Sequence, residues 1–296
     1  MKNFKKMVWN HYHTHGRDLP WRHTITPYRV VVSEIMLQQT QVSRVIPKFN
    51  SFVQKFPDFE TLARAPLHQV LTEWQGLGYN RRALHLKKLA DIVVNTNNTK
   101  NARINKLPRT KEALMELPGI GANTAGAVLA FAYNIPQAFI ETNIRSVFIH
   151  FFFRKARRKI DDNEIMELVE KSLTNKTANP RKWFYALMDY GVYLKSTIPN
   201  PSRKSRHYAR QSPFKGSNRE LRAQILRNII EKPRTVKEII RMHGKTKQRS
   251  EQSKGASTPS IMKNIANLEK EGFITKNNIN NNAKNGHFDN SFYVVQ

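Results

Sequence analysis

Hydrophobic residues recur at every third or fourth position over most of the chain, and polar or Gly- and Pro-containing breaks separate these runs. Residues 1–25 are predicted to form one amphipathic helix, with Phe4, Val8 and Tyr12 on one face, followed by a Gly-Arg-Asp-Leu-Pro break. The same pattern predicts helices at 26–37, 41–56, 59–64, 67–74, 81–96, 111–117, 122–132, 141–152, 161–173 and 181–195. Little strand pattern occurs before residue 270, so the main body is predicted to be all-α.

The pattern changes beyond residue 195. Residues 196–217 are rich in Pro, Ser and Arg, which is typical of a linker. After the linker come three short helical runs, at 218–230, 235–243 and 259–273, and the β-prone ending SFYVVQ. Together they predict a winged-helix-like unit. Polar loops are predicted at 95–106, 244–257 and 277–285.

The net charge gives the strongest indication of a binding partner. The chain of 296 residues carries a formal net charge of +28, and such an excess favours a polyanionic partner, because neutralised phosphates release counterions. The alternative is a generic basic protein from a Lys-, Asn- and Ile-rich proteome. No apolar run is long enough for a membrane span, and the N-terminus lacks the apolar segment of a signal peptide. A cytoplasmic protein without membrane contact is therefore expected.

The chain contains no cysteine, which excludes disulfides, a thiol nucleophile and thiolate-bound zinc or iron–sulfur clusters. Four histidines lie near the N-terminus, but the spacing of His11, His13 and His15 does not place all three on one helical face. No carboxylate or cysteine cluster accompanies them, so no metal site is predicted.

The segment LPGIGANTAGAVLAFA carries the sharpest local motif. Gly119 and Gly121 permit a backbone that approaches a surface closely, and the N–H groups of the following helix can bind a phosphate. Between two helices this is a helix–hairpin–helix element, which holds a DNA backbone without selecting sequence. An ordinary hairpin between two helices is the alternative.

Two further segments contain polar residues in apolar surroundings. Glu34 lies in VVVSEIMLQQTQV, where burial would raise the pKa of its carboxyl and make it a general acid. Alternatively, Glu34 lies on the solvent side of an amphipathic helix. Gln38 follows one helical turn later and Gln39 is next to it, and both suit hydrogen bonding to bases or insertion between them. Glu141 and Asn143 form a similar polar pair within FIETNIRSV.

The turn GLGYNRR places an aromatic residue beside arginines. Tyr79 could insert between bases while Arg81 and Arg82 meet phosphates, although a loop tyrosine is more often a packing residue.

Taken together and in order, HGRDLPWR, SEIMLQQTQV, WQGLGYNRRALHL, LPGIGANTAGAVL and IETNIRSV resemble the adenine DNA glycosylase (MutY) family of the helix–hairpin–helix superfamily of base-excision enzymes. The resemblance covers roughly residues 9–195. It implies a two-lobed helix–hairpin–helix glycosylase core, followed here by a small winged-helix-like domain. The domains expected are 1–26 with 134–212, an inserted helical-barrel domain at 27–133, and 213–296.

The resemblance also implies roles for individual residues. Glu34 matches the catalytic glutamate that protonates adenine, and Asn143 matches an asparagine of the site. Glu141 stands where the family has an aspartate that faces the sugar. The residues expected to contact DNA are Gln38, Gln39, Tyr79, Arg81, Gly119, Gly121, Asn123 and Thr124.

Several departures from the family bear on function. The family's four cluster cysteines are missing, with Lys195 at the first ligand position, so no 4Fe–4S cluster or other cofactor is expected. Asn123 replaces the lysine of related bifunctional enzymes, so strand-cleaving lyase activity is not expected. Asn80 stands where a second tyrosine is common, and the family's usual C-terminal domain is not visible.

The sequence therefore predicts a monofunctional, monomeric hydrolase that removes adenine opposite 8-oxoguanine or guanine in double-stranded DNA. Two alternatives stay open, namely a glycosylase for T or U opposite G, and a catalytically impaired DNA-binding homologue. The winged-helix-like unit could contribute DNA grip or a protein contact. The basic stretch 203–254 favours nonspecific DNA contact.

Overall fold

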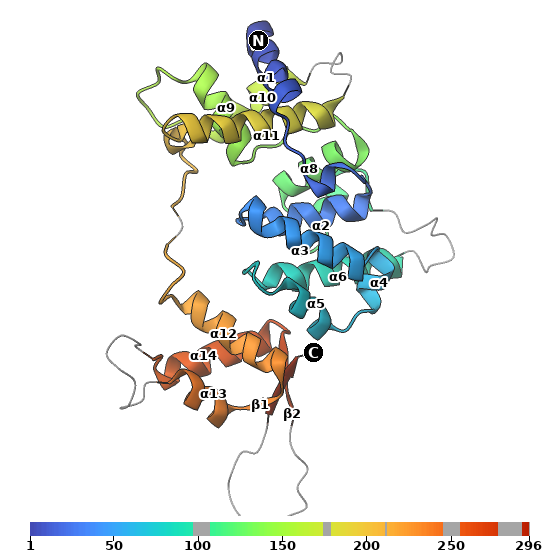
Figure 1. The fold of residues 1–296 in the computed structure, drawn as a ribbon, viewed down its shortest axis with the longest axis vertical. Helices are drawn as coiled ribbons and strands as arrows, with labels where there is room; N and C mark the ends of the chain where they lie inside the picture. Colours follow the sequence, from blue (N-terminus) through green and yellow to red (C-terminus); the bar gives the residue numbers. More distant parts are fainter. Residues whose placement is uncertain (97–106, 174–178, 211, 245–254, 278–291, 296) are drawn as a thin grey trace, which may run out of the picture.

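The chain forms two groups of helices and a separate C-terminal module (Figure 1). The computed structural model describes residues 1–96, 107–173, 179–210, 212–244, 255–277 and 292–295. Most of the loops expected at 95–106, 244–257 and 277–285 lie outside these residues. The helical periods predicted from sequence are confirmed for the main body, which is all-α over its described residues.

The first group joins the beginning of the chain to a later part of it (Figure 1). It contains α1 (Lys2–His15), α9 (Thr142–Phe152), α10 (Asp162–Ser172) and α11 (Pro180–Thr197). Phe4 on α1 packs against an aromatic cluster, with ring centroids 4.9–5.8 Å from those of Phe148, Phe151, Phe152 and Trp183. Such contacts stabilise the group by apolar burial and edge-to-face ring packing.

The helix predicted over residues 1–25 is shorter in the structure. It ends at His15, and a single 3₁₀ turn, η1 (Pro20–Arg22), follows an extended segment. Gly16 and Pro20 favour this break, and the Arg17 backbone N–H then donates to the Asp189 carboxylate at 2.9 Å. The predicted end at residue 25 was wrong, because the Gly-Arg-Asp-Leu-Pro break begins at Gly16 and ends the helix at His15.

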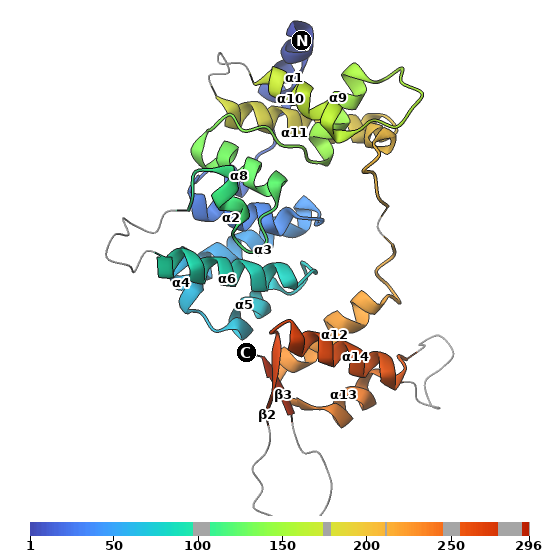
Figure 2. The ribbon, with the colours of Figure 1, turned by 180° about the vertical axis from the view of Figure 1, so that it is seen from behind.

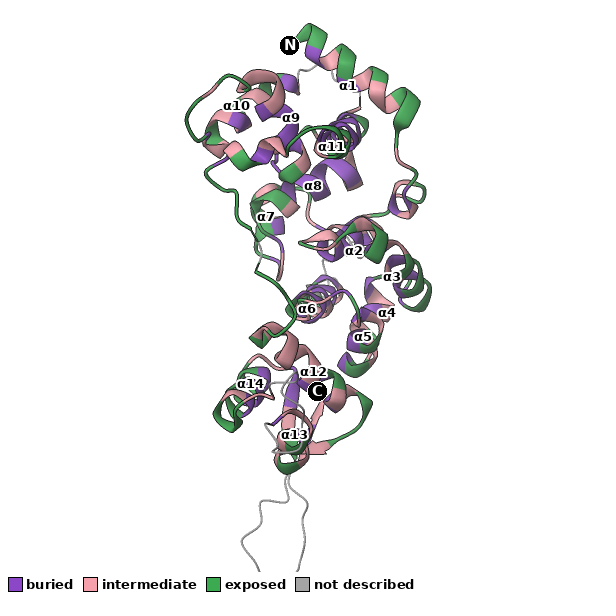
Figure 3. Cartoon of the chain, turned by 60° about the vertical axis from the view of Figure 1, so that its left-hand side comes forward, coloured by how far each residue is buried: buried purple, intermediate pink, exposed green. Residues whose placement is uncertain are grey.

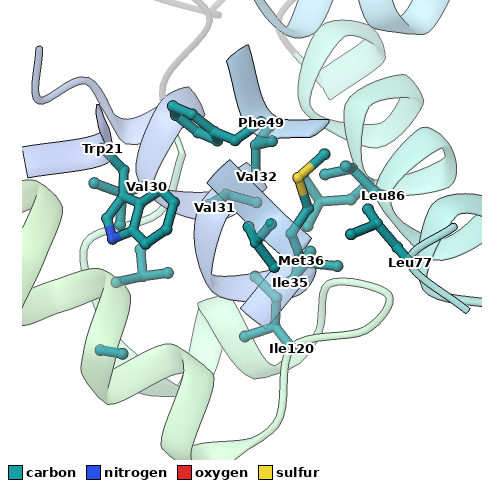
Figure 4. Close-up of a cluster of buried hydrophobic side chains, with 14 of the residues drawn as sticks. Trp21, Val30, Val31, Val32, Ile35, Met36, Phe49, Leu77, Leu86 and Ile120 are labelled. Carbon is teal, nitrogen blue, oxygen red and sulfur yellow. The ribbon is translucent and has the colours of Figure 1, made fainter. Parts of the chain in front are cut away.

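The second group surrounds α2 (Pro27–Leu37), whose Val31, Val32, Ile35 and Met36 are fully buried (Figure 4). Thr26 caps this helix by accepting a hydrogen bond from the Arg29 backbone N–H. The helices around α2 are α3 (Val42–Lys55), α4 (Phe59–Arg64), α5 (Leu67–Trp74), α6 (Arg81–Thr96), α7 (Lys111–Met115) and α8 (Ala122–Tyr133). The direct packing of α2 on α8, α3 and α6 gives its side chains fixed neighbours on several sides.

The C-terminal module, residues 212–295, combines three helices with a small sheet (Figure 2). After η2 (Pro201–Lys204) and the linker come α12 (Asn218–Glu231), β1 (Arg234–Thr235), α13 (Val236–His243), α14 (Thr258–Lys270), β2 (Ile274–Asn277) and β3 (Phe292–Val295). Antiparallel β3 lies between β1 and β2, and it pairs Val295 with Ile274 and Tyr293 with Arg234. Ile225, Ile239 and Phe273 are buried in a core that the helices and strands share.

Buried residues face inwards along the helices of both groups and of the module (Figure 3). The segment between η2 and α12 links the module to the rest of the chain (Figure 1). The divisions expected at residues 27, 134 and 213 fall in the segments between these parts, and they stay predictions of domain boundaries.

Candidate active site and DNA-facing loops

A cavity of about 250 Å³ lies between α2, α11 and the beginning of α9, beside the α1–η1 connection. The three residues predicted to be catalytic, Glu34, Glu141 and Asn143, all line it. Glu34 comes from α2 and the other two from the start of α9, so residues more than a hundred positions apart in sequence meet at one site. Their roles in catalysis stay predictions.

Glu34 lines the cavity from a helix whose other residues are mostly buried. Its neighbours Ser33 and Ile35 are buried, and Glu34 itself is only partly exposed. Desolvation, and then the negative charge of Glu141, raise the pKa of Glu34 to about 8, while Arg22 opposes the shift. The carboxyl is therefore protonated in most molecules at neutral pH, as a general acid requires.

Glu141 caps the helix that carries it. One carboxylate oxygen, Oε1, accepts hydrogen bonds from the backbone N–H groups of Asn143 at 2.8 Å and Ile144 at 3.0 Å. The other, Oε2, accepts from Asn143 Nδ2 at 3.1 Å. An acidic residue at the N-cap satisfies N–H groups that have no partner inside the helix and interacts favourably with the helix dipole. The first turn of its own helix thus fixes the orientation of the Glu141 carboxylate.

Asn143 also packs closely against the backbone of α11 at Gly191. A Cβ atom on Gly191 would lie 2.4 Å from the Asn143 carbonyl oxygen and 2.6 Å from its Cβ, so only glycine fits this crossing. The Asn143 Oδ1 atom is buried and has no hydrogen-bond partner among the described residues. A buried acceptor left open at a cavity is suited to a donor on a bound molecule.

Asp189 on α11 anchors the wall of the cavity. It is 2% exposed and accepts from the Arg17 backbone N–H and Nε, and from both terminal nitrogens of Arg22, at 2.6–2.9 Å. Desolvation opposes ionisation, but the Arg22 hydrogen bonds and charge, with Arg17, hold the pKa of Asp189 below its usual range. Sequence reasoning did not assign a role to Asp189, although an aspartate inside the apolar run ALMDYG was a signal for one.

The residues near Lys195 do not fit a cysteine-ligated cluster. The segment after α11 is instead held to the 153–160 loop by lysines. Lys204 Nζ donates to the carbonyls of Arg154 and Ala156, and Lys159 Nζ donates to that of Arg203. Within the described part of the chain, no group of three or more acidic or histidine side chains is arranged to hold a metal ion.

The predicted hairpin joins α7 to α8. Gly119 has a φ of +81°, which favours glycine, and Gly121 is the N-cap of α8 without a side-chain cap. Gln38 does not project freely, since its Nε2 donates to the Gly119 carbonyl at 3.3 Å and to Thr124 Oγ1 at 3.2 Å. Asn123 accepts from the Ile140 backbone N–H at 3.2 Å and does not line the cavity.

Gln39 and Tyr79 lie on two neighbouring loops in strained backbone conformations. Their φ angles are +53° and +48°, and the Tyr79 side chain is 39% exposed. Bulky residues rarely adopt positive φ, and such strain is often found at ligand contacts. The two positions suit the insertion into DNA predicted from the sequence.

Arg82 does not meet phosphates, contrary to the prediction. It is 8% exposed and donates to the carbonyls of Ile35, Met36 and Gln38 at the end of α2, at 2.6–2.8 Å. It also donates to Thr40 Oγ1 and to the carbonyls of Leu77 and Gly78, at 3.0–3.2 Å. Arg82 thereby satisfies the free carbonyls of a helix end and ties the 38–40 loop to the 76–80 turn.

The C-terminal module contacts this same surface. Glu271 pairs with Arg81 at 2.8 Å and with Arg222 at 2.7 Å, and Arg219 donates to the Tyr79 hydroxyl at 2.9 Å. Two residues expected to contact DNA are therefore engaged by the module. Sequence reasoning did not find this contact, because about 140 and 190 residues separate the partners.

Residues 32–174 match the HhH-GPD superfamily of base excision DNA repair proteins, so this part of the chain is an HhH-GPD domain. More narrowly, the helical core is similar to curated adenine DNA glycosylases. That of Buchnera aphidicola subsp. Baizongia pistaciae is 36% identical over 195 residues, which cover 64% of this chain and 52% of the relative. That of Mycolicibacterium smegmatis is 40% identical over 132 residues, or 44% of this chain and 43% of the relative. The resemblance seen in the motifs is confirmed for the core.

The chain spans about half the length of the curated relatives it matches. Among solved structures, that of a thermostable thymine-DNA glycosylase is 28% identical, with a TM-score of 0.58, and the match covers 69% of this chain and 92% of that one. This similarity confirms the predicted fold of the core. No helix among the described residues is long and apolar enough to cross a membrane.

Proposed function

We propose that the chain is a DNA N-glycosylase that hydrolyses adenine from mispairs with 8-oxoguanine or guanine. The observation that carries the proposal is the pair of carboxyl groups at one cavity. Glu34 has a pKa of about 8, whereas Glu141 acts as an acceptor for three N–H groups. Base excision needs an acid at the base and a carboxylate at the sugar, the same division as in glycosidases.

The chemistry follows from these two positions. Glu34 donates its proton to the purine ring, which makes adenine a better leaving group as the bond from C1′ to the base breaks. Positive charge then develops on the sugar, and the Glu141 carboxylate stabilises it. Asn143 orients Glu141 through Nδ2, and its open Oδ1 accepts a hydrogen bond from substrate or water. Glu34, once deprotonated, is placed to activate the water that attacks C1′.

Double-stranded DNA with a mispair is the proposed partner. The net charge of +28 supports backbone binding, and the Gly119–Gly121 hairpin offers N–H groups to a phosphate. Gln39 and Tyr79 would enter the base stack while adenine is turned out into the cavity. The proposal includes the expectations of a cluster-free monomer in the cytoplasm.

Single-turnover release of adenine from a duplex with an A:8-oxoguanine pair tests the proposal. We expect release by the wild type and a loss of about a hundredfold or more in Glu34→Gln, which keeps the shape but cannot donate the proton. Glu141→Gln should also lose activity, whereas Glu141→Asp tests how far the carboxylate position matters. No release by the wild type, or equal release by Glu34→Gln, refutes the proposal.

The similarity to a thymine-DNA glycosylase supports a second candidate, removal of T or U opposite G. The raised pKa of Glu34 favours a purine, because a purine leaving group gains most from protonation. Parallel assays with A:8-oxoguanine, A:G, T:G and U:G duplexes separate the candidates. A catalytically impaired DNA-binding homologue would release no base from any duplex, and Glu141→Asp would then create activity.

A further inference from the structure

The helix α14 of the C-terminal module follows α13 and packs against α13, α12 and β2. The Ala256 backbone N–H donates to the His243 carbonyl at 2.8 Å, which holds the beginning of α14 beside the end of α13. In helix–turn–helix proteins the second helix of such a pair lies in the major groove of DNA, while the first crosses the backbone. Because a fold alone does not define a function, the side chains of α14 decide what this helix can bind.

One face of α14 is buried and the opposite face is exposed. The buried face carries Ile261, Asn264, Ile265 and Leu268. Asn264 Nδ2 donates to Asn218 Oδ1 on α12 at 2.7 Å, which fixes the rotation of α14 about its axis. Residues three and four apart are neighbours on a helix surface, so a single stripe is left facing solvent, formed by Pro259, Lys263, Ala266, Asn267 and Lys270.

Two lysines and one amide give this stripe its chemistry. The side chains of Lys263, Asn267 and Lys270 have no hydrogen bond or ion pair with any other described residue. The one acidic residue of α14, Glu269, lies about 100° around the helix from Lys270. Lys263 and Lys270 are about 10 Å apart along the helix axis, which is close to the width of the major groove, about 12 Å. Each amine can therefore reach a phosphate at one side of the groove, while Asn267 faces the base edges between them.

The charge of the module favours DNA over a protein as the partner of this stripe. Residues 212–295 contain sixteen Lys and Arg but seven Asp and Glu, and phosphates neutralised by such an excess release counterions. The centre of a protein-binding surface is typically poor in lysine and rich in aromatic residues, whereas the stripe has two lysines and no aromatic residue. Lysine is a flexible point charge that suits a phosphate, and one asparagine reads at most one base pair, so little sequence preference is expected.

We propose that α14 is a second duplex-binding element, which lies in the major groove and holds DNA mainly by its phosphates. The polar contacts of the module with the core come from Arg219 and Glu271 and from none of the exposed α14 residues, so docking leaves the stripe open. α14 also lies beyond the basic stretch 203–254 that the sequence indicated for nonspecific contact. The second element lengthens the stretch of DNA that one molecule holds, whichever base the core removes.

Photo-cross-linking tests the position of the DNA directly, because the chain has no cysteine. Ala266→Cys places a single thiol on the exposed stripe, and Glu231→Cys places one at the exposed end of α12 as the control. Each full-length variant carries an aryl azide on its thiol and is irradiated with an undamaged duplex of about 30 base pairs, or about three helical turns. We expect about fivefold or more cross-linked DNA with Ala266→Cys than with Glu231→Cys, although the control has lost a negative charge.

Salt dependence gives a second measurement on the same duplex. Fluorescence anisotropy follows binding by the full-length Lys263→Gln/Lys270→Gln variant at several salt concentrations. Loss of two phosphate contacts should weaken binding by about tenfold near physiological salt and reduce the slope of log K against log salt by about 2. The matched control, Arg227→Gln/Lys232→Gln, removes the same two charges from exposed positions on α12 and just after it, and should change the slope by less than half as much.

Equal cross-linking by the two thiols, or equal slopes for the two double variants, overturns the proposal, because charge would then act without a defined site. Unchanged binding by Lys263→Gln/Lys270→Gln also overturns it and indicates that the stripe serves another partner, such as a protein. All the substituted positions are exposed, so every variant should keep the unfolding midpoint of the wild type. The duplex contains no mispair, so neither measurement depends on adenine removal, and failure of either proposal leaves the other standing.

Discussion

Gly191→Ala should damage the active site, although Gly191 is not itself among the residues predicted to act on DNA, because the substitution displaces Asn143. The added Cβ would lie 2.4 Å from the Asn143 carbonyl oxygen, 2.6 Å from its Cβ and 2.7 Å from its carbonyl carbon. Ordinary van der Waals contact begins near 3.4 Å, so α9 and α11 must separate by about 1 Å. The atoms in the way are mainly backbone, and a rotamer change therefore cannot relieve the clash.

The size of the effect follows from that displacement. Forcing extra volume into a packed contact typically costs about 1–3 kcal/mol of the free energy of unfolding. Because Glu141 and Asn143 form the first turn of α9, they move with it relative to Glu34 on α2. A misplacement of about 1 Å can lower the rate of the chemical step by about a hundredfold.

Two measurements check this reasoning. Urea denaturation gives the free energy of unfolding, and single-turnover adenine release at saturating protein gives the rate of the chemical step. Gly121→Ala is the matched control for stability, since its φ of −94° suits alanine and no atom lies within 4 Å of the added Cβ. A fully active Gly191→Ala enzyme, or one as stable as Gly121→Ala, would show that this crossing does not position the site.

Four more predictions concern titration, the module and the loops. Base release should fall as pH rises above about 8, because Glu34 must be protonated. Since the folded pKa of Glu34 lies above its ordinary value, ionisation destabilises the folded state. Thermal unfolding should therefore show Glu34→Gln gaining stability over the wild type from about pH 5 to about pH 8, and a constant difference contradicts this. Glu271→Gln removes two ion pairs, so it should free Arg81 and tighten DNA binding by about two- to fivefold in a titration at fixed salt, whereas unchanged or weaker binding argues against a competing contact. Arg82→Lys leaves buried carbonyls unpaired and should lower the free energy of unfolding by about 2–4 kcal/mol, and a loss below about 1 kcal/mol would be inconsistent with a stabilising role for the Arg82 hydrogen bonds.

Local periodicity predicted the helices well, because each amphipathic run has one face to bury. The runs at 59–64 and 67–74 match α4 and α5 residue for residue. The raised pKa of Glu34 was expected from sequence for a related reason, since a carboxyl group inside an apolar helix is desolvated. Its catalytic role stays a prediction. The prediction of a helix over 1–25 was wrong at its C-terminal end, because a glycine and a proline, and not periodicity, determine where that helix ends.

Long-range polar contacts could not be predicted in the same way. Asp189 and Arg17 are 172 positions apart, and the local sequence around either residue does not indicate which residue it will contact. Arg82 was misjudged because an arginine in a basic turn suits a phosphate as well as it suits a set of backbone carbonyls. Its burial depends on the path of α2 and of the 76–80 turn, which only the folded chain defines.

The clamp made by Arg82 has a consequence for the energetics of binding. One guanidinium group holds both the 38–40 loop and the 76–80 turn, so the separation between Gln39 and Tyr79 is set before any duplex arrives. Ordering a mobile loop on binding consumes conformational entropy, and a preorganised loop avoids most of that loss. The strain in the two backbones is thus carried permanently by the free protein, and in the proposed reaction more of the contact energy with DNA would remain for opening the base stack.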